Sequence, residues 1–271
     1  MSRHPRYLAT ALFMLLVAYS AVAGAHDTWL LPSSLRVSVG QSVTLSLTSG
    51  MAFPVNNSAI VPTRVSLAVA RLNGVTTPLR GAKSTNSSLR YLWRPATAGV
   101  AALGIELAPK TLTLAPAKIE EYFIEINAGS ELRAAWAQIP APKRWRESYA
   151  KHAKSFVRVG EAAADTSWRT PLGFSLELIP DQDPTSLRPG DTFRVRVLHD
   201  GQPFPNFAVG AVGPGTTAAK FSKTDANGYA VVELPRAGLW LLNGTDLRRT
   251  ERKGLEWESD FTTLTIAVNA R

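Results

Sequence analysis

The fold is decided by one stretch of the sequence, LRVSVGQSVTLSL at residues 35–47. Apolar side chains occupy every second position on both sides of Gly40. Successive side chains of a β-strand point to opposite faces, so this period of two predicts two half-buried strands that meet at the glycine. The same alternation returns at residues 65–69. We therefore predict that the chain opens with an antiparallel β-sandwich.

The last part of the chain also has the pattern of β-strands, in shorter apolar segments. Two dipeptides that favour tight hairpin turns, Asp200-Gly201 and Asn227-Gly228, lie among these runs. Short apolar runs separated by turn residues are typical of an immunoglobulin-like sandwich of about 100 residues. The runs lie at residues 172–179, 193–198, 209–212, 229–234, 239–242 and 261–268. The predicted fold is all-β, with two β-sandwich domains of which the C-terminal one is immunoglobulin-like.

Two segments show a helical period instead. In residues 116–129 the apolar positions recur at intervals of three and four, with proline at the start and glycine at the end, which predicts one amphipathic helix. A second apolar stripe predicts a helix that bridges the two domains. This stripe consists of Trp145, Tyr149, His152 and Phe156. The run at 156–159 equally fits a strand, in which case the helix ends near Ser155.

The domain plan follows from these patterns. Residues 26–142 are predicted to form the N-terminal β-sandwich with its one helix. Residues 143–170 are predicted to form the helical bridge and a linker, and residues 171–271 the C-terminal sandwich. Two modest domains agree with the usual domain size of roughly 100–200 residues.

The N-terminus has the pattern of a secretory signal peptide at residues 1–25. Arg3 and Arg6 precede an apolar core at residues 8–17, and Ala23-Gly24-Ala25 forms a small-residue cleavage site. The apolar core is too short to span a bilayer of about 30 Å. We expect cleavage before His26, a periplasmic location, and no stable membrane insertion of the mature chain.

Composition excludes several classes of site. The chain has no cysteine, so a metal site needs nitrogen or oxygen ligands. The net charge of +9 is scattered along the chain, without a recognition helix or basic-aromatic repeats, so nucleic-acid binding is not expected. Phosphate-binding loops and histidine-rich zinc motifs are also missing, and we expect no enzymatic activity and no catalytic residues.

His26 has particular chemistry if it becomes the first residue. One residue then offers a free α-amine and an imidazole, close enough to chelate a single ion. Such nitrogen donors suit nickel, cobalt and copper better than calcium or magnesium. The alternative is that cleavage merely leaves a histidine at this position.

Several segments resemble one known family. The opening His26-Asp27-Thr28-Trp29-Leu30 resembles the mature N-terminus of an exported bacterial family of unknown function, which is grouped with the NikM-like components of nickel and cobalt uptake. Further similar segments lie at residues 149–151, 157–160, 171–180, 187–191, 224–228, 235–242 and 257–259. The resemblance implies β-sandwich domains outside the cytoplasmic membrane, transition-metal uptake or sensing, and an inner-membrane metal transporter as partner.

The predicted metal ligands are His26, Asp27, Asp246 and Glu258. The resemblance adds the two later carboxylates, although the family often has a histidine where this chain has Asp246, and aspartate is a harder oxygen donor. The alternative for these carboxylates is a surface ion pair with Arg248 or Arg249. His152 is interpreted as a core histidine of the predicted helix, and His199 as a solvated residue at a strand end.

The sequence thus predicts a periplasmic metal-binding accessory protein for nickel and cobalt, or copper, without a chemical step. The alternative function is a metal-free adhesion or assembly module that presents an edge strand or loop surface to a protein or glycan.

Overall fold

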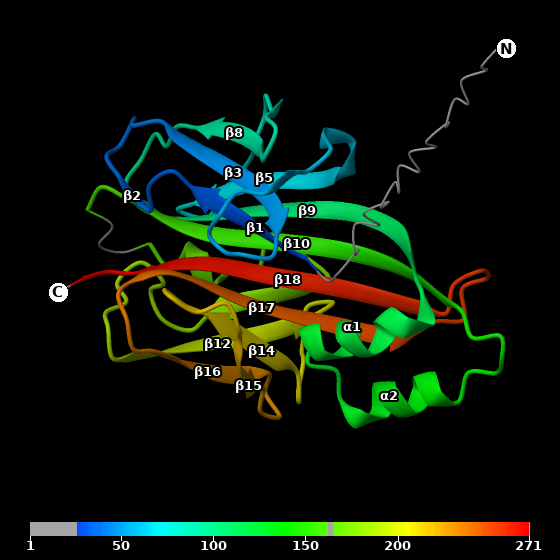
Figure 1. The fold of residues 1–271 in the computed structure, drawn as a ribbon. Helices are drawn as coiled ribbons and strands as arrows, with labels where there is room; N and C mark the ends of the chain where they lie inside the picture. Colours follow the sequence, from blue (N-terminus) through cyan, green and yellow to red (C-terminus); the bar gives the residue numbers. More distant parts are fainter. Residues whose placement is uncertain (1–25, 162–164, 271) are drawn as a thin grey trace, which may run out of the picture.

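The computed structural model describes residues 26–161 and 165–270, and the predicted signal peptide at residues 1–25 lies outside this part of the chain. The described residues form three β-sheets that stack as layers (Figure 1). Strand content dominates, and the all-β prediction is confirmed.

The middle layer is a nine-stranded sheet. Its strands follow the order β15, β14, β17, β18, β10, β9, β5 and β6, and the short strand β2 also pairs with β10. The sheet joins the N-terminal and C-terminal parts of the chain, because β18 pairs in parallel with β10. The bounds are β2 Arg36–Val37, β5 Val65–Leu72, β6 Val75–Pro78, β9 Gly99–Leu114, β10 Trp145–Val159, β14 Ala208–Val212, β15 Lys220–Lys223, β17 Gly238–Arg249 and β18 Trp257–Val268.

One outer sheet comes from the N-terminal part of the chain. It contains β1 Asp27–Pro32, β3 Val43–Gly50, β4 Ser58–Ala59, β7 Lys83–Ser84 and β8 Leu89–Trp93. Its apolar side chains pack against Val157 and neighbouring residues of the central sheet. The stretch 35–47 that predicted the first sandwich thus forms β2 and most of β3.

The other outer sheet covers the opposite face. It contains β11 Leu176–Pro180, β12 Asp191–His199, β13 Gln202–Pro203 and β16 Tyr229–Leu234. Its apolar side chains pack with Phe156, the residue next to Val157 on β10, and adjacent residues of a strand point to opposite faces. Each outer sheet therefore forms one sandwich with the shared central sheet, and the C-terminal one consists of the antiparallel strands β11 to β18.

Two short helices lie beside the sandwich. The 3₁₀ helix Pro116–Lys118 leads into α1 Ile119–Glu125, which confirms the helix predicted at residues 116–129. A second helix, α2 Ser130–Ala137, follows and was not predicted. Two further 3₁₀ helices lie at Pro62–Arg64 and Ser167–Arg169. None of the helices in the described ranges is long and apolar enough to cross a membrane.

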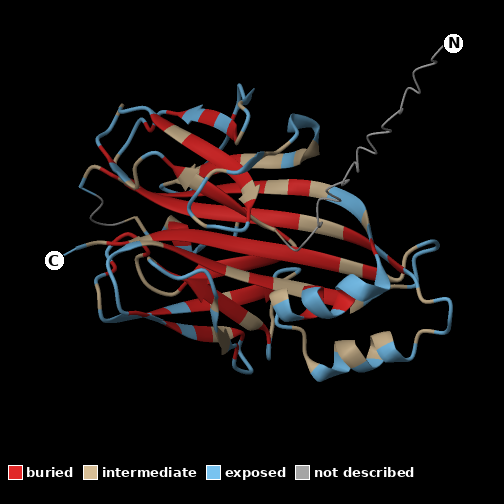
Figure 2. Cartoon of the chain, in the orientation of Figure 1, coloured by how far each residue is buried: buried red, intermediate tan, exposed pale blue. Residues whose placement is uncertain are grey.

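The predicted bridging helix is wrong, because Trp145–Val159 forms strand β10. β10 lies in the middle of the central sheet and is covered on both faces (Figure 2). The polar residues Glu147, Lys151 and Lys154 are buried there, whereas a helix with the predicted apolar stripe would carry them on its opposite side. His152 is therefore a residue of a buried strand, and a strand joins the two sandwiches.

Lys154 and Glu177 tie β10 to the second outer sheet. The Lys154 Nζ lies 2.6 Å from the Glu177 Oε1, and both side chains are only 1% exposed. Glu177 also accepts hydrogen bonds from the backbone amides of residues 172–174, and Lys154 donates to the carbonyl of Leu178. A buried ion pair needs such additional bonds to offset the loss of hydration.

Replacement of Lys154 by methionine should strongly destabilise the protein. The substitution leaves the Glu177 carboxylate buried without its counter-charge, and we expect a loss of about 3–5 kcal/mol in the free energy of unfolding, measured by urea denaturation. Lys220→Met breaks an ion pair whose two side chains are 77% and 68% exposed, and should cost at most about 1 kcal/mol. Equal losses in the two variants would contradict the structural role of the buried pair.

Candidate functional site

The first residues of β1 are fixed against the central sheet. Lys151 of β10 donates a hydrogen bond from its Nζ to the carbonyl oxygen of His26. Asn243 of β17 donates to the Asp27 Oδ2 at 2.7 Å. Thr263 of β18 donates to the carbonyl of Thr28 at 2.6 Å. Three central strands therefore hold the segment that follows the predicted cleavage site.

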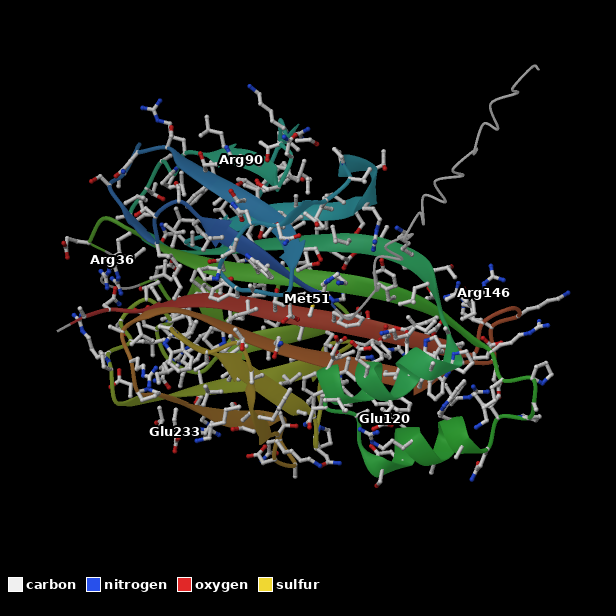
Figure 3. The ribbon with its side chains drawn as sticks, in the orientation of Figure 1. Arg36, Met51, Arg90, Glu120, Arg146 and Glu233 are labelled. Atoms are coloured by element: carbon white, nitrogen blue, oxygen red, sulfur yellow. The ribbon has the colours of Figure 1, made fainter. Side chains whose placement is uncertain are left out.

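His26 and Asp27 line a cavity of about 370 Å³, which we call the His26 cavity. Its other walls come from the loop after β3, from α1 and from residues 212–221. The loop contributes Met51, which is labelled in Figure 3 and is 69% exposed. Helix α1 contributes Glu125. The cavity thus combines an imidazole, two carboxyl groups and a thioether.

Burial sets the charge state of this site. It lowers the pKa of His26, and the neighbouring Lys151 lowers it further while Glu125 acts in the opposite direction. Burial raises the pKa of Asp27, although the hydrogen bond from Asn243 and the charge of Lys151 oppose the rise. Burial also lowers the pKa of Lys151 to about 8. The lowered pKa of His26 favours its neutral imidazole, which is the form that binds metals.

Asp246 and Glu258 lie on the other face of the central sheet. Asn243 faces β1, and Asp246 is three residues farther along the same strand, so its side chain points to the opposite side. The structure therefore separates the four predicted ligands into two pairs, with His26 and Asp27 on one face and Asp246 and Glu258 on the other.

Arginines contact both of the later carboxylates. The Arg248 Nη1 donates to the Asp246 Oδ2 at 2.8 Å and to the Asp260 Oδ2 at 2.8 Å. Arg252 donates to the Glu258 Oε1 at 2.6 Å. Burial raises the pKa of Asp246, although Arg248 and His199 counteract it. The ion pair with Arg248 that the sequence left open as an alternative is thus present.

His152 and His199 both lie near these carboxylates, which the sequence had not indicated. The His199 Nε2 lies 3.5 Å from the Asp246 Oδ2. His152 approaches Asp260 through Ser175, whose hydroxyl donates to the Asp260 Oδ1 at 2.7 Å and lies 3.2 Å from the His152 Nε2. A possible signal was Asp260, which shares a strand face with Glu258, but the register that pairs it with Asp246 could not be seen in the sequence.

Ser175, His152 and Asp260 suggest a nucleophilic triad by residue type, but their arrangement differs from one. In a triad the histidine accepts the serine proton and the carboxylate orients the histidine. Here Ser175 donates to Asp260, and the His152 Nδ1 contacts the backbone carbonyl of Phe261 at 3.1 Å. The amides of residues 172–174 just before Ser175 are bonded to Glu177. The arrangement orients Asp260 and does not activate the serine.

Comparison with protein families identifies the chain. A family model described as a domain of unknown function (DUF4198) matches residues 23–245. The chain belongs to the DUF4198 family. The DUF4198 match includes His26 and Asp27, whereas Asp246 and Glu258 lie beyond its end. The predicted membership in a family of unknown function is confirmed, and the link to NikM-like uptake components stays a prediction.

Solved structures similar to this DUF4198 protein include adhesins. The D0-D1 domain of intimin is 11% identical, with 89% of this chain and 97% of that chain covered and a TM-score of 0.21. The Yersinia pseudotuberculosis adhesin InvE is 12% identical, with 89% and 58% covered and a TM-score of 0.22. The Escherichia coli adhesin FdeC is 12% identical, with 92% and 65% covered and a TM-score of 0.22. No curated protein sequence matches the chain. Scores this low carry no argument about function.

Removal of the Lys151 charge should raise the pKa of His26. We expect this in Lys151→Met, because the positive charge beside the imidazole disfavours its protonation. The pKa can be followed by an NMR titration of the His26 ring protons in the mature protein. Lys83→Met, which removes an exposed lysine on β7, should leave it unchanged. An unchanged or lower pKa in Lys151→Met would contradict the electrostatic contact.

Proposed function

We propose that this protein is a periplasmic metal-binding accessory protein that holds one nickel, cobalt or copper ion at His26 after removal of the signal peptide. The observation that carries the proposal is the position of His26 in the wall of a cavity that also contains carboxyl groups, where burial lowers its pKa and favours the neutral imidazole. Cleavage before His26 would add its α-amine as a second nitrogen donor. An inner-membrane metal transporter is the proposed partner.

The surroundings of His26 supply charge for a bound cation. Asp27 and Glu125 line the same cavity. Lys151 carries the opposing charge, but its Nζ is bonded to the His26 carbonyl and its pKa of about 8 lies well below that of an ordinary lysine. A cation at His26 would lower that pKa further and favour the neutral amine. The binding of a metal is therefore compatible with the buried lysine.

Met51 favours copper among the three metals. The chain has no cysteine and three methionines, of which Met1 and Met14 lie in the predicted signal peptide. Met51 would then supply the only sulfur atom of the mature chain, and its side chain is exposed at the His26 cavity. A thioether is a soft donor that selects Cu(I), whereas imidazole and amine donors also suit nickel and Cu(II).

Calorimetric titration of Ni(II), Co(II) and Cu(II) into protein whose first residue is His26 tests the proposal. We expect binding of one ion, abolished in His26→Ala. A matched control carries one alanine before His26, which keeps the imidazole but removes its chelating amine, and should bind much more weakly. Metal binding indifferent to His26, or absent, would refute the proposal and favour the metal-free adhesion or assembly module.

The pH dependence should follow the α-amine. The lowered pKa of His26 leaves its imidazole already neutral at pH 7, so the amine, with a usual pKa of about 7.7–8.0, is the group that must lose a proton. Affinity for Ni(II) should rise about tenfold per pH unit below that pKa and level off above it. Loss of the Lys151 proton near pH 8 acts in the same direction. A constant affinity between pH 6 and 8 would contradict chelation by the amine.

Substitution of Met51 should separate copper from nickel. Met51→Leu keeps a similar apolar volume and removes the sulfur. We expect weaker binding of Cu(I), measured by competition with a chromophoric chelator under reducing conditions, and unchanged binding of Ni(II). Equal Cu(I) affinity in the two proteins would show that Met51 is not a ligand, without affecting the proposal for His26.

A further inference from the structure

A second group of metal-ligand side chains lies on the opposite face of the central sheet from His26. His199 ends β12, Asp246 lies on β17 and Asp260 lies on β18. One ligand atom from each of the three side chains lies within 4.8 Å of the other two. We call these residues, together with Arg248 and Glu258, the Arg248 cluster.

The Arg248 cluster concentrates negative charge in a basic protein. Asp246, Asp260 and Glu258 face the guanidinium groups of Arg248 and Arg252. The side chains of Asp246 and Asp260 are only 14% and 7% exposed. Three carboxylates against two arginines leave an excess of negative charge, although the chain as a whole carries +9. Such a site attracts an additional cation.

Arg248 occupies the position between the two aspartates. Its Nη1 lies 2.8 Å from the Oδ2 of both Asp246 and Asp260. The Arg248 side chain is 39% exposed, and its Nη2 is already 3.9 Å from the Glu258 Oε2. An outward movement of the guanidinium toward solvent would bring it closer to Glu258, so it would keep a carboxylate partner.

The surroundings hold the three ligands in place. The His199 ring packs against Phe204 with ring centroids 5.2 Å apart, and its Nδ1 lies 3.9 Å from the Asp200 Oδ2. The Nε2, which faces Asp246, is the ring nitrogen placed to act as the ligand. On the other side, the Ser175 hydroxyl orients Asp260 through its Oδ1 and leaves the Oδ2 for a cation.

Thr262 adds an independent observation beside the cluster. It lies two residues after Asp260 on the same face of β18 and pairs with His152 across the sheet. Thr262 is 1% exposed, and its hydroxyl has no hydrogen-bond partner among the described residues. A buried hydroxyl without a partner is costly unless a water or ligand satisfies it.

We propose that His199, Asp246 and Asp260 form a divalent-cation site in which the Arg248 guanidinium acts as a resident cation and is displaced by the metal. One imidazole and two carboxylates suit Zn²⁺, Co²⁺ or Mn²⁺, with ligand distances of about 2.0–2.2 Å for zinc. The site is separate from His26, so it can exist whether or not the amino terminus binds metal.

Titration of Co(II) and Zn(II) into His26→Ala protein tests this site alone. Co(II) absorption reports the ligand geometry, and calorimetry gives the affinity for Zn(II). Removal of the resident cation in Arg248→Met should tighten binding by about tenfold, the size of effect seen when groups around metal ligands change. The control Arg236→Met removes an arginine outside the cluster and should leave the affinity unchanged.

The ligands are tested in the same background. Asp246→Asn and His199→Gln should each abolish the tightened binding of Arg248→Met. If Arg248→Met does not fold, as judged by its thermal transition, Arg248→Lys provides the comparison, since a single ammonium bridges two carboxylates less well than a guanidinium. The proposal is overturned if neither Arg248 variant binds more tightly than its parent, or if binding survives Asp246→Asn. Binding that is lost in His26→Ala and does not return when Arg248→Met is added would also overturn the proposal, because metal would then bind only at the amino terminus.

Discussion

The parallel pairing of β10 with β18 is the constraint on which the rest of the structure depends. It places both strands in the middle of a sheet covered on both faces, where a buried polar side chain is costly unless it has a hydrogen-bond partner. Lys151 donates a hydrogen bond to the carbonyl of His26, and Lys154 donates one to Glu177. His152 is hydrogen-bonded to Ser175. These partners fix the amino terminus, the second outer sheet and the polar group around Asp260. The buried polar groups of one strand therefore contact the surroundings of both candidate sites.

The sequence was informative wherever one face of a strand meets solvent or a turn interrupts the chain. The alternation at residues 35–47 and the turns Asp200-Gly201 and Asn227-Gly228 predicted strands correctly. The proline and glycine that bound residues 116–129 predicted a helix. The same reasoning failed at β10, because burial on both faces removes the alternation. The charged residues of β10 then fitted the pattern of the exposed side of a helix. Their burial is explained only by partner residues that are distant in the sequence.

The candidate site was predictable only in its local part. The cleavage pattern identified His26, and Asp27 was identified because it is the next residue. Met51, Glu125 and Asn243, in contrast, reach the same region from three separate elements. No local pattern reveals such a meeting. Resemblance placed Asp246 and Glu258 with His26, whereas strand alternation places them on opposite faces of one sheet. Sequence spacing does not determine the face of a strand when its register is unknown.

The shared central sheet also determines when folding can finish. β18 is the last strand among the described residues, yet it lies between β10 and β17 in the middle of the sheet, and its pairing closes a loop from Glu147 to Trp257. Contacts so distant in sequence carry a large entropic cost and slow folding. In a chain delivered from its amino terminus, the edge of β10 that pairs with β18 lacks this partner until residues 257–268 have been delivered. The central sheet is therefore completed only after β18 has arrived.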